Sequence, residues 1–168
     1  MNRALFLDRD GVINEDYGYV HKIEDFHFRE GIFDVCRAAQ KARLKIIVVT
    51  NQAGIGRGLY GYDEFSSLTA YMMNRMNEEG VTIEEIFHCP YHETGGIGHY
   101  RRSDADRKPG SGMIVKACSI HNINPLLSIM IGDNHSDLIA AQRAGIKLFV
   151  DASRPDWVAR SLVTIDLY

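Results

Sequence analysis

The sequence contains no apolar run that approaches the roughly 18 to 20 residues needed to span a membrane, and it has no internal repeat and no linker rich in serine, glycine or proline. These absences exclude membrane-spanning and repeat proteins. The formal net charge is only -3, which provides no long-range attraction for nucleic acid or an anionic membrane. We therefore expect neither nucleic acid nor a membrane as a partner, and a bound phosphate group must rely on a few well-placed cations and amides.

Cysteine is also scarce. The three cysteines, Cys36, Cys89 and Cys118, are odd in number and widely spaced, and no secretory apolar segment precedes them because charged residues begin at Arg3. This pattern is typical of a reducing compartment. We expect a cytoplasmic protein.

What is present is ordinary for a globular protein. The chain has 168 residues, of which 45% are hydrophobic and 24% charged, and this length suits one domain with its own core. We expect residues 1–168 to form a single domain. No apolar stripe is left over once the predicted core is assigned, so a monomer is expected.

Apolar runs of strand length alternate with longer segments of helical spacing. The predicted strands are 4–7, 45–49, 83–87, 128–131 and 147–150, and the predicted helices are 32–42, 62–79, 112–121 and 136–144. Such alternation favours an α/β fold with a parallel sheet covered on both faces, in which ligands bind beyond the carboxyl ends of the strands. The segments 14–30 and 89–112 do not fit this scheme, and we predict that they are loops over the site.

Two acidic residues follow the first predicted strand, where the chain turns at Gly11. Asp8 and Asp10 are two residues apart, and alternation along a strand would place them on one side. Aspartate and glycine are also common turn residues. By itself, this motif is weak evidence of a catalytic site.

Three further fragments carry polar groups to strand ends or loops. Thr50 ends the second predicted strand, and the glycine-rich stretch 54–58 that follows offers backbone amides to an anion, although Thr50 could also cap the next helix. Asp133 follows the fourth strand, and Arg107 and Lys108 supply two cations just before the third predicted helix. Each fragment is ordinary when taken alone.

Taken together and in this order, the fragments around Asp8, Thr50, Lys108 and Asp133 resemble the motif set of the haloacid dehalogenase superfamily of phosphotransferases. The resemblance covers nearly the whole chain. It implies a three-layer α/β sandwich with a doubly wound, Rossmann-like parallel sheet, a magnesium ion, and hydrolysis of a phosphomonoester through a phosphorylated aspartate. No large cap domain is expected, because the interval 12–46 is too short to hold one besides its predicted helix.

A closer likeness is to the family of D-glycero-D-manno-heptose 1,7-bisphosphate phosphatases, and it is carried by the segments 6–14, 16–20, 50–55, 89–90 and 107–109. It implies a small phosphorylated sugar as substrate, loss of its 7-phosphate, and a place in lipopolysaccharide or surface-polysaccharide heptose synthesis. Histidinol-phosphate phosphatases share much of the pattern and form the alternative, although segments 18–21 and 50–58 are more similar to the heptose enzymes. A non-catalytic binding domain of the same fold is a second alternative, and the intact motif residues argue against it.

The resemblance implies a role for individual residues. Asp8 is the nucleophile and Asp10 the general acid and base, while Thr50 and Lys108 hold the oxygens of the transferred phosphoryl group. The implied magnesium ligands are the carboxylates of Asp8 and Asp133 and the backbone carbonyl of Asp10. The implied substrate-binding residues are Asp16, Tyr19, Asn51, Gln52, Ala53, Arg57, Arg107 and Asn134.

The expected contacts of Asn51, Gln52 and Asn134 can be specified further. The backbone amides of Asn51 and Gln52 are expected to assist at the phosphoryl group, and Asn134 stands where some relatives place a lysine that contacts phosphate. Asp137 is expected to support the metal site without binding the ion directly.

The chain departs from the heptose phosphatases in the loop that usually carries a structural zinc, bound by C-x-H and C-x-C pairs. The first pair reads Cys89-Pro90-Tyr91 and the second Asp104-Ala105-Asp106, so three of the four ligands are absent. His88, His92 and His99 offer nitrogen atoms that could join Cys89 on a zinc ion. A metal-free loop is nevertheless the expectation.

Overall fold

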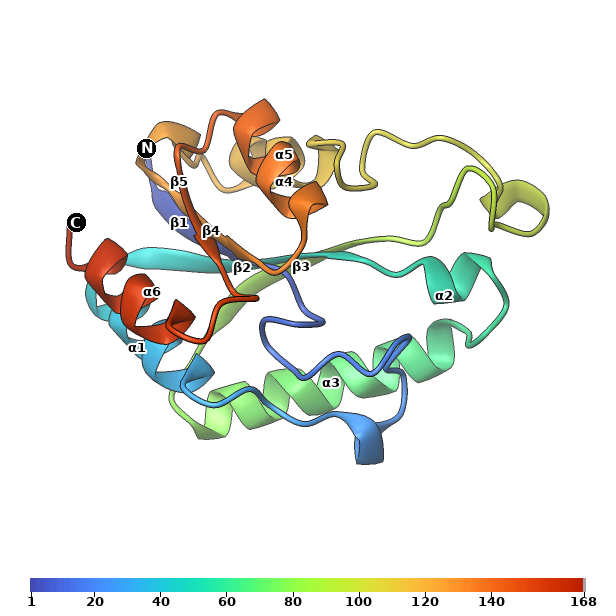
Figure 1. The fold of residues 1–168 in the computed structure, drawn as a ribbon, viewed down its shortest axis with the longest axis horizontal. Coiled ribbons are helices and arrows are strands. Elements are labelled where there is room, and N and C mark those ends of the chain that lie inside the picture. Colours follow the sequence, from blue (N-terminus) through green and yellow to red (C-terminus); the bar gives the residue numbers. More distant parts are fainter. Residues whose placement is uncertain (168) are drawn as a thin grey trace.

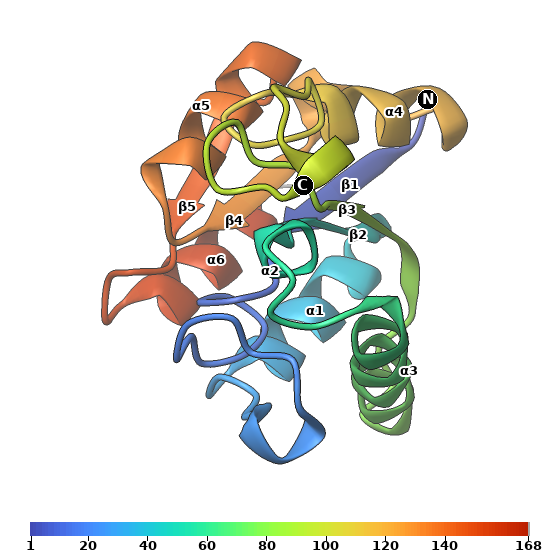
Figure 2. The ribbon, with the colours of Figure 1, turned by 90° about the vertical axis from the view of Figure 1, so that its right-hand side faces the viewer.

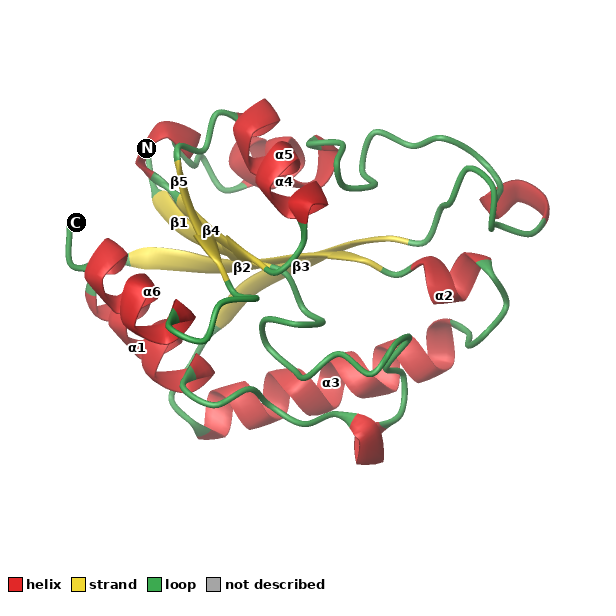
Figure 3. Cartoon of the chain, viewed as in Figure 1, coloured by secondary structure: helices red, strands yellow, loops and turns green. Residues whose placement is uncertain are grey.

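A single parallel sheet of five strands lies at the centre of the computed structural model, which describes residues 1–167 (Figure 1, Figure 3). The strands are β1 (Arg3–Leu7), β2 (Leu44–Asn51), β3 (Ile83–Cys89), β4 (Ile129–Gly132) and β5 (Leu148–Asp151). Each predicted strand overlaps one of them. The inner strands read as nearly continuous apolar runs because helices cover both of their faces.

The order of the strands is β3-β2-β1-β4-β5, and all neighbouring pairs are parallel. The chain builds outward from β1 through β2 to β3, and then returns to the other side of β1 to add β4 and β5. The reversal falls between β1 and β4. In open α/β sheets, the crevice that binds ligands lies at such a reversal, beyond the carboxyl ends of the strands.

Side chains of β1 alternate between two cores on opposite faces of the sheet. Leu5 and Leu7 enter the core formed with α1 (Ile32–Lys41), α3 (Tyr62–Glu78) and α6 (Trp157–Ile165). Ala4 and Phe6 enter the core formed with α4 (Gly112–Ile120) and α5 (His135–Ala144). Figure 1 shows α4 and α5 above the sheet and the other three helices below it. The predicted three-layer α/β sandwich is therefore confirmed.

Helix α5 begins immediately beyond the end of β4. The backbone N–H of Asn134 donates to Asp137 Oδ2 at 3.1 Å, which satisfies a donor at the start of the helix. The helix ends at Gly145, whose φ of 90° is the left-handed conformation that stops many helices. This start places Asp137 in the first turn, directed back towards the sheet.

Two helices were not predicted. Helix α2 (Ala53–Gly56) is a single glycine-rich turn that follows β2. Helix α6 buries Trp157, Ser161 and Ile165 at helical spacing, although its last four residues are mostly β-branched and favour a strand. The two irregular segments are mainly loops, as predicted, apart from 3-10 helices at Ile23–Asp25 and Gly98–Tyr100. Within residues 1–167, none of the helices has the length and apolar character to cross a membrane.

Candidate active site

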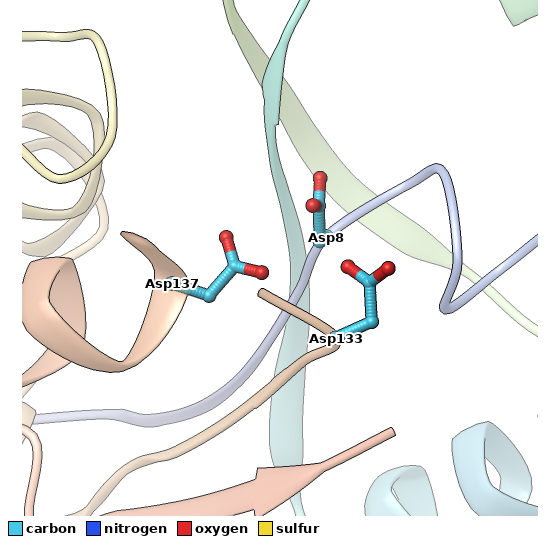
Figure 4. A group of neighbouring side chains, drawn as sticks. All are labelled: Asp8, Asp133 and Asp137. Atoms are coloured by element: carbon cyan, nitrogen blue, oxygen red, sulfur yellow. The ribbon is translucent and has the colours of Figure 1, made fainter. Parts of the chain in front are cut away.

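Three carboxylates converge beyond the carboxyl ends of β1 and β4 (Figure 4). Asp8 directly follows β1, Asp133 directly follows β4, and Asp137 lies in the first turn of α5. One oxygen from each side chain lies within 4.8 Å of the other two. The structure therefore brings together the two acids predicted at neighbouring strand ends and adds Asp137 to them.

Lys108 reaches this group from the segment between β3 and α4 and is 3% exposed. Its ammonium forms ion pairs with Asp8 Oδ1 at 2.9 Å and with Asp137 Oδ1 at 2.6 Å, and it donates a hydrogen bond to the carbonyl of Val49 at 2.9 Å. The ammonium therefore has two charged partners and one hydrogen-bond acceptor within the protein. The backbone N–H of Arg9 also donates to Asp8 Oδ1, at 2.7 Å. The Asp8 side chain is therefore held in one orientation.

Burial dominates the electrostatics of this group. It raises the pKa of Asp8 to about 7, with Asp137 adding to the effect and Lys108 opposing it. Burial also raises the pKa of Asp133, and Asp137 again adds to the effect. For Lys108, burial by itself lowers the pKa, but the attraction of Asp8 and Asp137 is larger and the pKa is raised. Lys108 is therefore a fixed cation, whereas the carboxylates resist ionisation in each other's presence.

The charges of this group fit a divalent metal ion. Three carboxylates and one ammonium sum to two negative charges when all are ionised, and a divalent cation would balance them. Carboxylate oxygens are also the ligands that magnesium prefers. No other three His, Cys, Asp or Glu side chains in residues 1–167 are arranged closely enough to share a metal ion. The residues present therefore fit magnesium.

Two glycines make the close approach of the acids possible. A Cβ at Gly11 would overlap the Asp133 carboxylate, and Gly11 also has a φ of 80°, which other residues rarely adopt. A Cβ at Gly132 would overlap the side chain of Asp137. Each of the two positions must therefore be a glycine, because a neighbouring aspartate occupies the space that a Cβ would need.

Asp10 has its own set of hydrogen-bond donors. Arg9 donates from Nη2 to both oxygens of Asp10 at 2.9 Å, Asn14 donates to Oδ1 at 3.0 Å, and Gln52 donates to Oδ2 at 3.2 Å. Arg9 is itself 2% exposed and also donates to the carbonyl of Val20, at 2.6 Å. Asp10 is therefore positioned by donors from its own loop and from the segment after β2.

A pocket of about 370 Å³ opens over Asp8, Asp10 and Lys108, and sites for small molecules typically measure about 300 to 1,000 Å³. Helix α2 and the connection that follows it, which contribute Ala53, Arg57 and Tyr60 to the lining, face the viewer in Figure 2. All the predicted substrate-binding residues line this pocket, namely Asp16, Tyr19, Asn51, Gln52, Ala53, Arg57, Arg107 and Asn134. Thr50 and Asp133 do not line it, and Thr50 is 1% exposed.

Two arginines in the pocket form no ion pair with any residue of the described chain, namely Arg57 and Arg107. The guanidinium of Arg57 lies 5.7 Å from the ring centroid of Tyr19. Arg107 donates to the carbonyl of Tyr91 at 3.1 Å. Burial lowers the pKa of Arg107, and the charge of Arg57 lowers it further. The two cations therefore repel each other, and an anion bound between them would relieve this repulsion.

Sequence reasoning missed Tyr60, which lines the same pocket and is 8% exposed. Its hydroxyl donates to Gln52 Oε1, and its ring stacks on His21 with the centroids 4.9 Å apart. Tyr60 lies in an irregular connection and matches no motif, so no sequence signal marked it. One prediction for Gln52 was wrong: its backbone N–H donates to the carbonyl of Cys89 at 2.8 Å and is not free for the phosphoryl group.

The side chains at the three positions where the zinc ligands are substituted have partners within the protein. The ring of Tyr91 lies under the guanidinium of Arg102 at 3.7 Å, and Arg102 also pairs with Asp104 at 3.0 Å. Asp106 pairs with Lys116. The side chains at the three substituted ligand positions are thus engaged with cations of the protein itself.

The chain is similar to known proteins in both sequence and structure. The family model described as "HAD-hyrolase-like" matches residues 105–153. The D-glycero-beta-D-manno-heptose-1,7-bisphosphate 7-phosphatase of Vibrio cholerae is 43% identical over 154 residues, which cover 90% of this chain and 83% of the relative. The D-glycero-alpha-D-manno-heptose-1,7-bisphosphate 7-phosphatase of Burkholderia mallei is 44% identical over 167 residues, which cover 96% of this chain and 88% of the relative.

Among solved structures, the D,D-heptose 1,7-bisphosphate phosphatase from B. bronchiseptica, complexed with magnesium and phosphate, superimposes with a TM-score of 0.75 at 27% sequence identity. The match covers 85% of this chain and 76% of that chain. The fold is thus common to both.

Proposed function

The chain belongs to the family of D-glycero-D-manno-heptose-1,7-bisphosphate 7-phosphatases, within the haloacid dehalogenase-like hydrolases, and we propose that Asp8 is the nucleophile with which it removes the 7-phosphate in a magnesium-dependent reaction. Both curated relatives carry this name, so histidinol phosphate is not favoured as the substrate. We further propose that residues 1–168 act as a single-domain cytoplasmic monomer, and the single sheet of five strands supports the assignment to one domain.

One observation supports this function above the others: Asp8 lines the pocket, yet its carboxylate is held by Lys108 within a group that fits a divalent cation. A phosphate ester resists attack because the nucleophile approaches negative charge, so a site for phosphoryl transfer must supply positive charge and alignment. The Asp8 site offers both. An ion pair that served only to stabilise the fold would not need to lie at a pocket of this size.

In the first half-reaction, a carboxylate oxygen of Asp8 attacks the phosphorus of the 7-phosphate. The bond from phosphorus to the sugar oxygen breaks, and Asp10 gives a proton to the departing oxygen. Phosphorylation removes the negative charge of Asp8 and so weakens its ion pair with Lys108. The Lys108 ammonium then pairs with an oxygen of the phosphoryl group.

In the second half-reaction, a water molecule attacks the phosphorus of the phosphorylated Asp8 while Asp10 accepts its proton. The bond from phosphorus to Asp8 breaks, and phosphate leaves. We propose that Thr50 supports both steps, because its Oγ1 accepts from Gln52 at 2.9 Å and its own proton is therefore left to donate to a phosphoryl oxygen.

Magnesium would be held by the carboxylates of Asp8 and Asp133 and the backbone carbonyl of Asp10, where it would neutralise the oxygens of the phosphoryl group. Asp137 contributes through Lys108, with which it forms an ion pair at 2.6 Å. The loop after β3 is proposed to function without zinc, because Arg102 and Lys116 already engage the side chains at the substituted ligand positions.

The phosphate that is not cleaved needs cations of its own. Arg57 and Arg107 line the pocket without an acidic partner in the described chain, and they are close enough to affect each other. We propose that they bind the second phosphate of the bisphosphate. Tyr19 supports Arg57 from a backbone conformation that is rare for a residue with a side chain, with a φ of 53°.

The test is phosphate release in the presence of magnesium from both anomers of D-glycero-D-manno-heptose 1,7-bisphosphate and from histidinol phosphate. Phosphorus NMR of the product identifies which phosphate was removed. The expected result is loss of the 7-phosphate, no release after chelation of magnesium, and no release by Asp8→Asn. Preferential release from histidinol phosphate, or removal of the 1-phosphate, would contradict the proposal.

A further inference from the structure

Asn51 and Gln52 line the pocket, yet their hydrogen bonds run to catalytic residues of the protein. Asn51 Nδ2 donates to the backbone carbonyl of Lys108 at 3.0 Å, and the backbone N–H of Lys108 donates to Asn51 Oδ1 at 3.0 Å. The Asn51 amide therefore closes a ring of two hydrogen bonds with the main chain of a residue 57 positions away. This ring fixes the backbone from which the Lys108 ammonium reaches Asp8.

Gln52 has no N–H left for a ligand. Its backbone N–H donates to the carbonyl of Cys89 at 2.8 Å, and its side-chain amide donates to Asp10 Oδ2 at 3.2 Å and to Thr50 Oγ1 at 2.9 Å. A glutamine has one backbone and two side-chain N–H donors, so all three are used. Gln52 is also only 2% exposed. A substrate could accept a hydrogen bond from Gln52 only if one of these three bonds were broken.

Tyr60 determines which way the Gln52 amide points. The Tyr60 hydroxyl donates to Gln52 Oε1, which leaves Nε2 facing Asp10 and Thr50. A flipped amide would place Oε1 beside the Asp10 carboxylate and would lose the bond from Tyr60. Burial raises the pKa of Tyr60 to about 12, so the hydroxyl keeps its proton at physiological pH. The ring itself has little freedom, because it packs against Gly54, where a Cβ would overlap it, and stacks on His21.

We propose that the side chains of Asn51 and Gln52 act by positioning catalytic residues: Asn51 fixes Lys108, Gln52 fixes Asp10 and Thr50, and Tyr60 locks the orientation of Gln52. The proposal rests on the phosphatase function described above. Asn51 thus acts on Lys108, whereas Gln52 acts on Asp10 and Thr50. Two consecutive residues, the last of β2 and the one after it, thereby set the geometry of the reacting groups.

The proposal is tested by the steady-state kinetics of Gln52→Met, Asn51→Leu and Tyr60→Phe with the heptose bisphosphate. Misplaced reacting groups reduce kcat, whereas lost substrate contacts increase KM. We expect kcat to fall at least about tenfold for the first two variants and about threefold for Tyr60→Phe, while KM and the inhibition constant of inorganic phosphate stay within about threefold. Tyr71→Phe, which removes a hydroxyl outside the pocket, is the matched control and should change neither.

A double-mutant cycle separates positioning from a general loss of structure. If Tyr60 acts through Gln52, then Tyr60→Phe should have no further effect on kcat once Gln52→Met is present. Equal effects of Tyr60→Phe in both backgrounds, or a tenfold rise in KM with kcat unchanged in the Gln52 and Asn51 variants, would overturn the proposal. Should the Gln52 variant fail to fold, an unchanged kcat in Tyr60→Phe overturns the role of Tyr60 by itself. An inactive wild type would point instead to failure of the proposed function.

Discussion

Replacing the nucleophile Asp8 by asparagine should abolish phosphate release and yet stabilise the metal-free protein. Asp8 is 8% exposed, and burial raises its pKa from 3.8 to about 7 although Lys108 opposes this effect. Asparagine carries no charge into the buried site. Lys108 also keeps a partner in the variant, because its ion pair with Asp137 at 2.6 Å remains. One ammonium then faces one carboxylate instead of two.

The sign of the effect follows from the direction of the shift. Because the folded-state pKa of Asp8 lies above the unfolded value, the folded state favours the protonated acid. This contribution to stability is complete below about pH 4 and is lost as the pH rises to about 7. At about 1.36 kcal/mol for each tenfold change in proton affinity, the loss amounts to about 4 kcal/mol at most. Asp8→Asn does not ionise and should not show this loss.

The assay is urea unfolding of the wild type and Asp8→Asn at pH 5 and pH 8 in the presence of a chelator. The stability advantage of the variant should grow by about 2 to 3 kcal/mol between the two pH values. Magnesium should reduce the advantage at pH 8, because it favours ionised Asp8. Asp25→Asn, at an exposed aspartate, is the control and should show no such growth. Parallel pH curves for the wild type and Asp8→Asn in chelator would refute the reasoning.

Three further predictions concern the rest of the site. Gly11→Ala should lower magnesium affinity and kcat/KM at least about tenfold, because its Cβ would displace the Asp133 carboxylate; titration calorimetry and kinetics measure both. Arg57→Met should raise KM for the bisphosphate about tenfold but change KM for a heptose monophosphate less, since a lost charged contact typically costs about 1.5 to 3 kcal/mol; equal effects on the two substrates would contradict this. Metal analysis of the purified protein should find no stoichiometric zinc, and activity after chelation should return with magnesium alone; one zinc per chain, lost together with activity, would contradict a zinc-free loop.

Much of the fold followed from the sequence because its elements have unambiguous local patterns. The inner strands are short apolar runs, and their periodicity differs clearly from that of the helices between them. Helix α6 was missed because local preference and tertiary structure disagree: Val163, Thr164 and Ile165 favour a strand, but the segment is helical in the structure and buries Trp157 and Ile165 in the core. Helix α2 has a single turn, which is too short to show a period.

The candidate site was predictable where residues stand at strand ends and only partly elsewhere. Asp8 and Asp133 meet because β1 and β4 are neighbours in a parallel sheet, which a strand-end motif can indicate. The ion pair between Lys108 and Asp137 joins segments that no sequence pattern relates. The same holds for Tyr60, whose contact with Gln52 depends on the path of an irregular loop. The contacts between segments that are distant in the sequence could be identified only from the structure.

The most direct test of the central claim is to look for a phosphoryl group on Asp8 during turnover. The enzyme is mixed with magnesium and the heptose bisphosphate, quenched in acid within one turnover, and digested for mass analysis of the peptide that contains Asp8. The account predicts that this peptide gains one phosphoryl group, which forms and decays at least as fast as kcat, and that Asp8→Asn neither gains it nor releases phosphate. Phosphate release by Asp8→Asn at the wild-type rate would contradict the account.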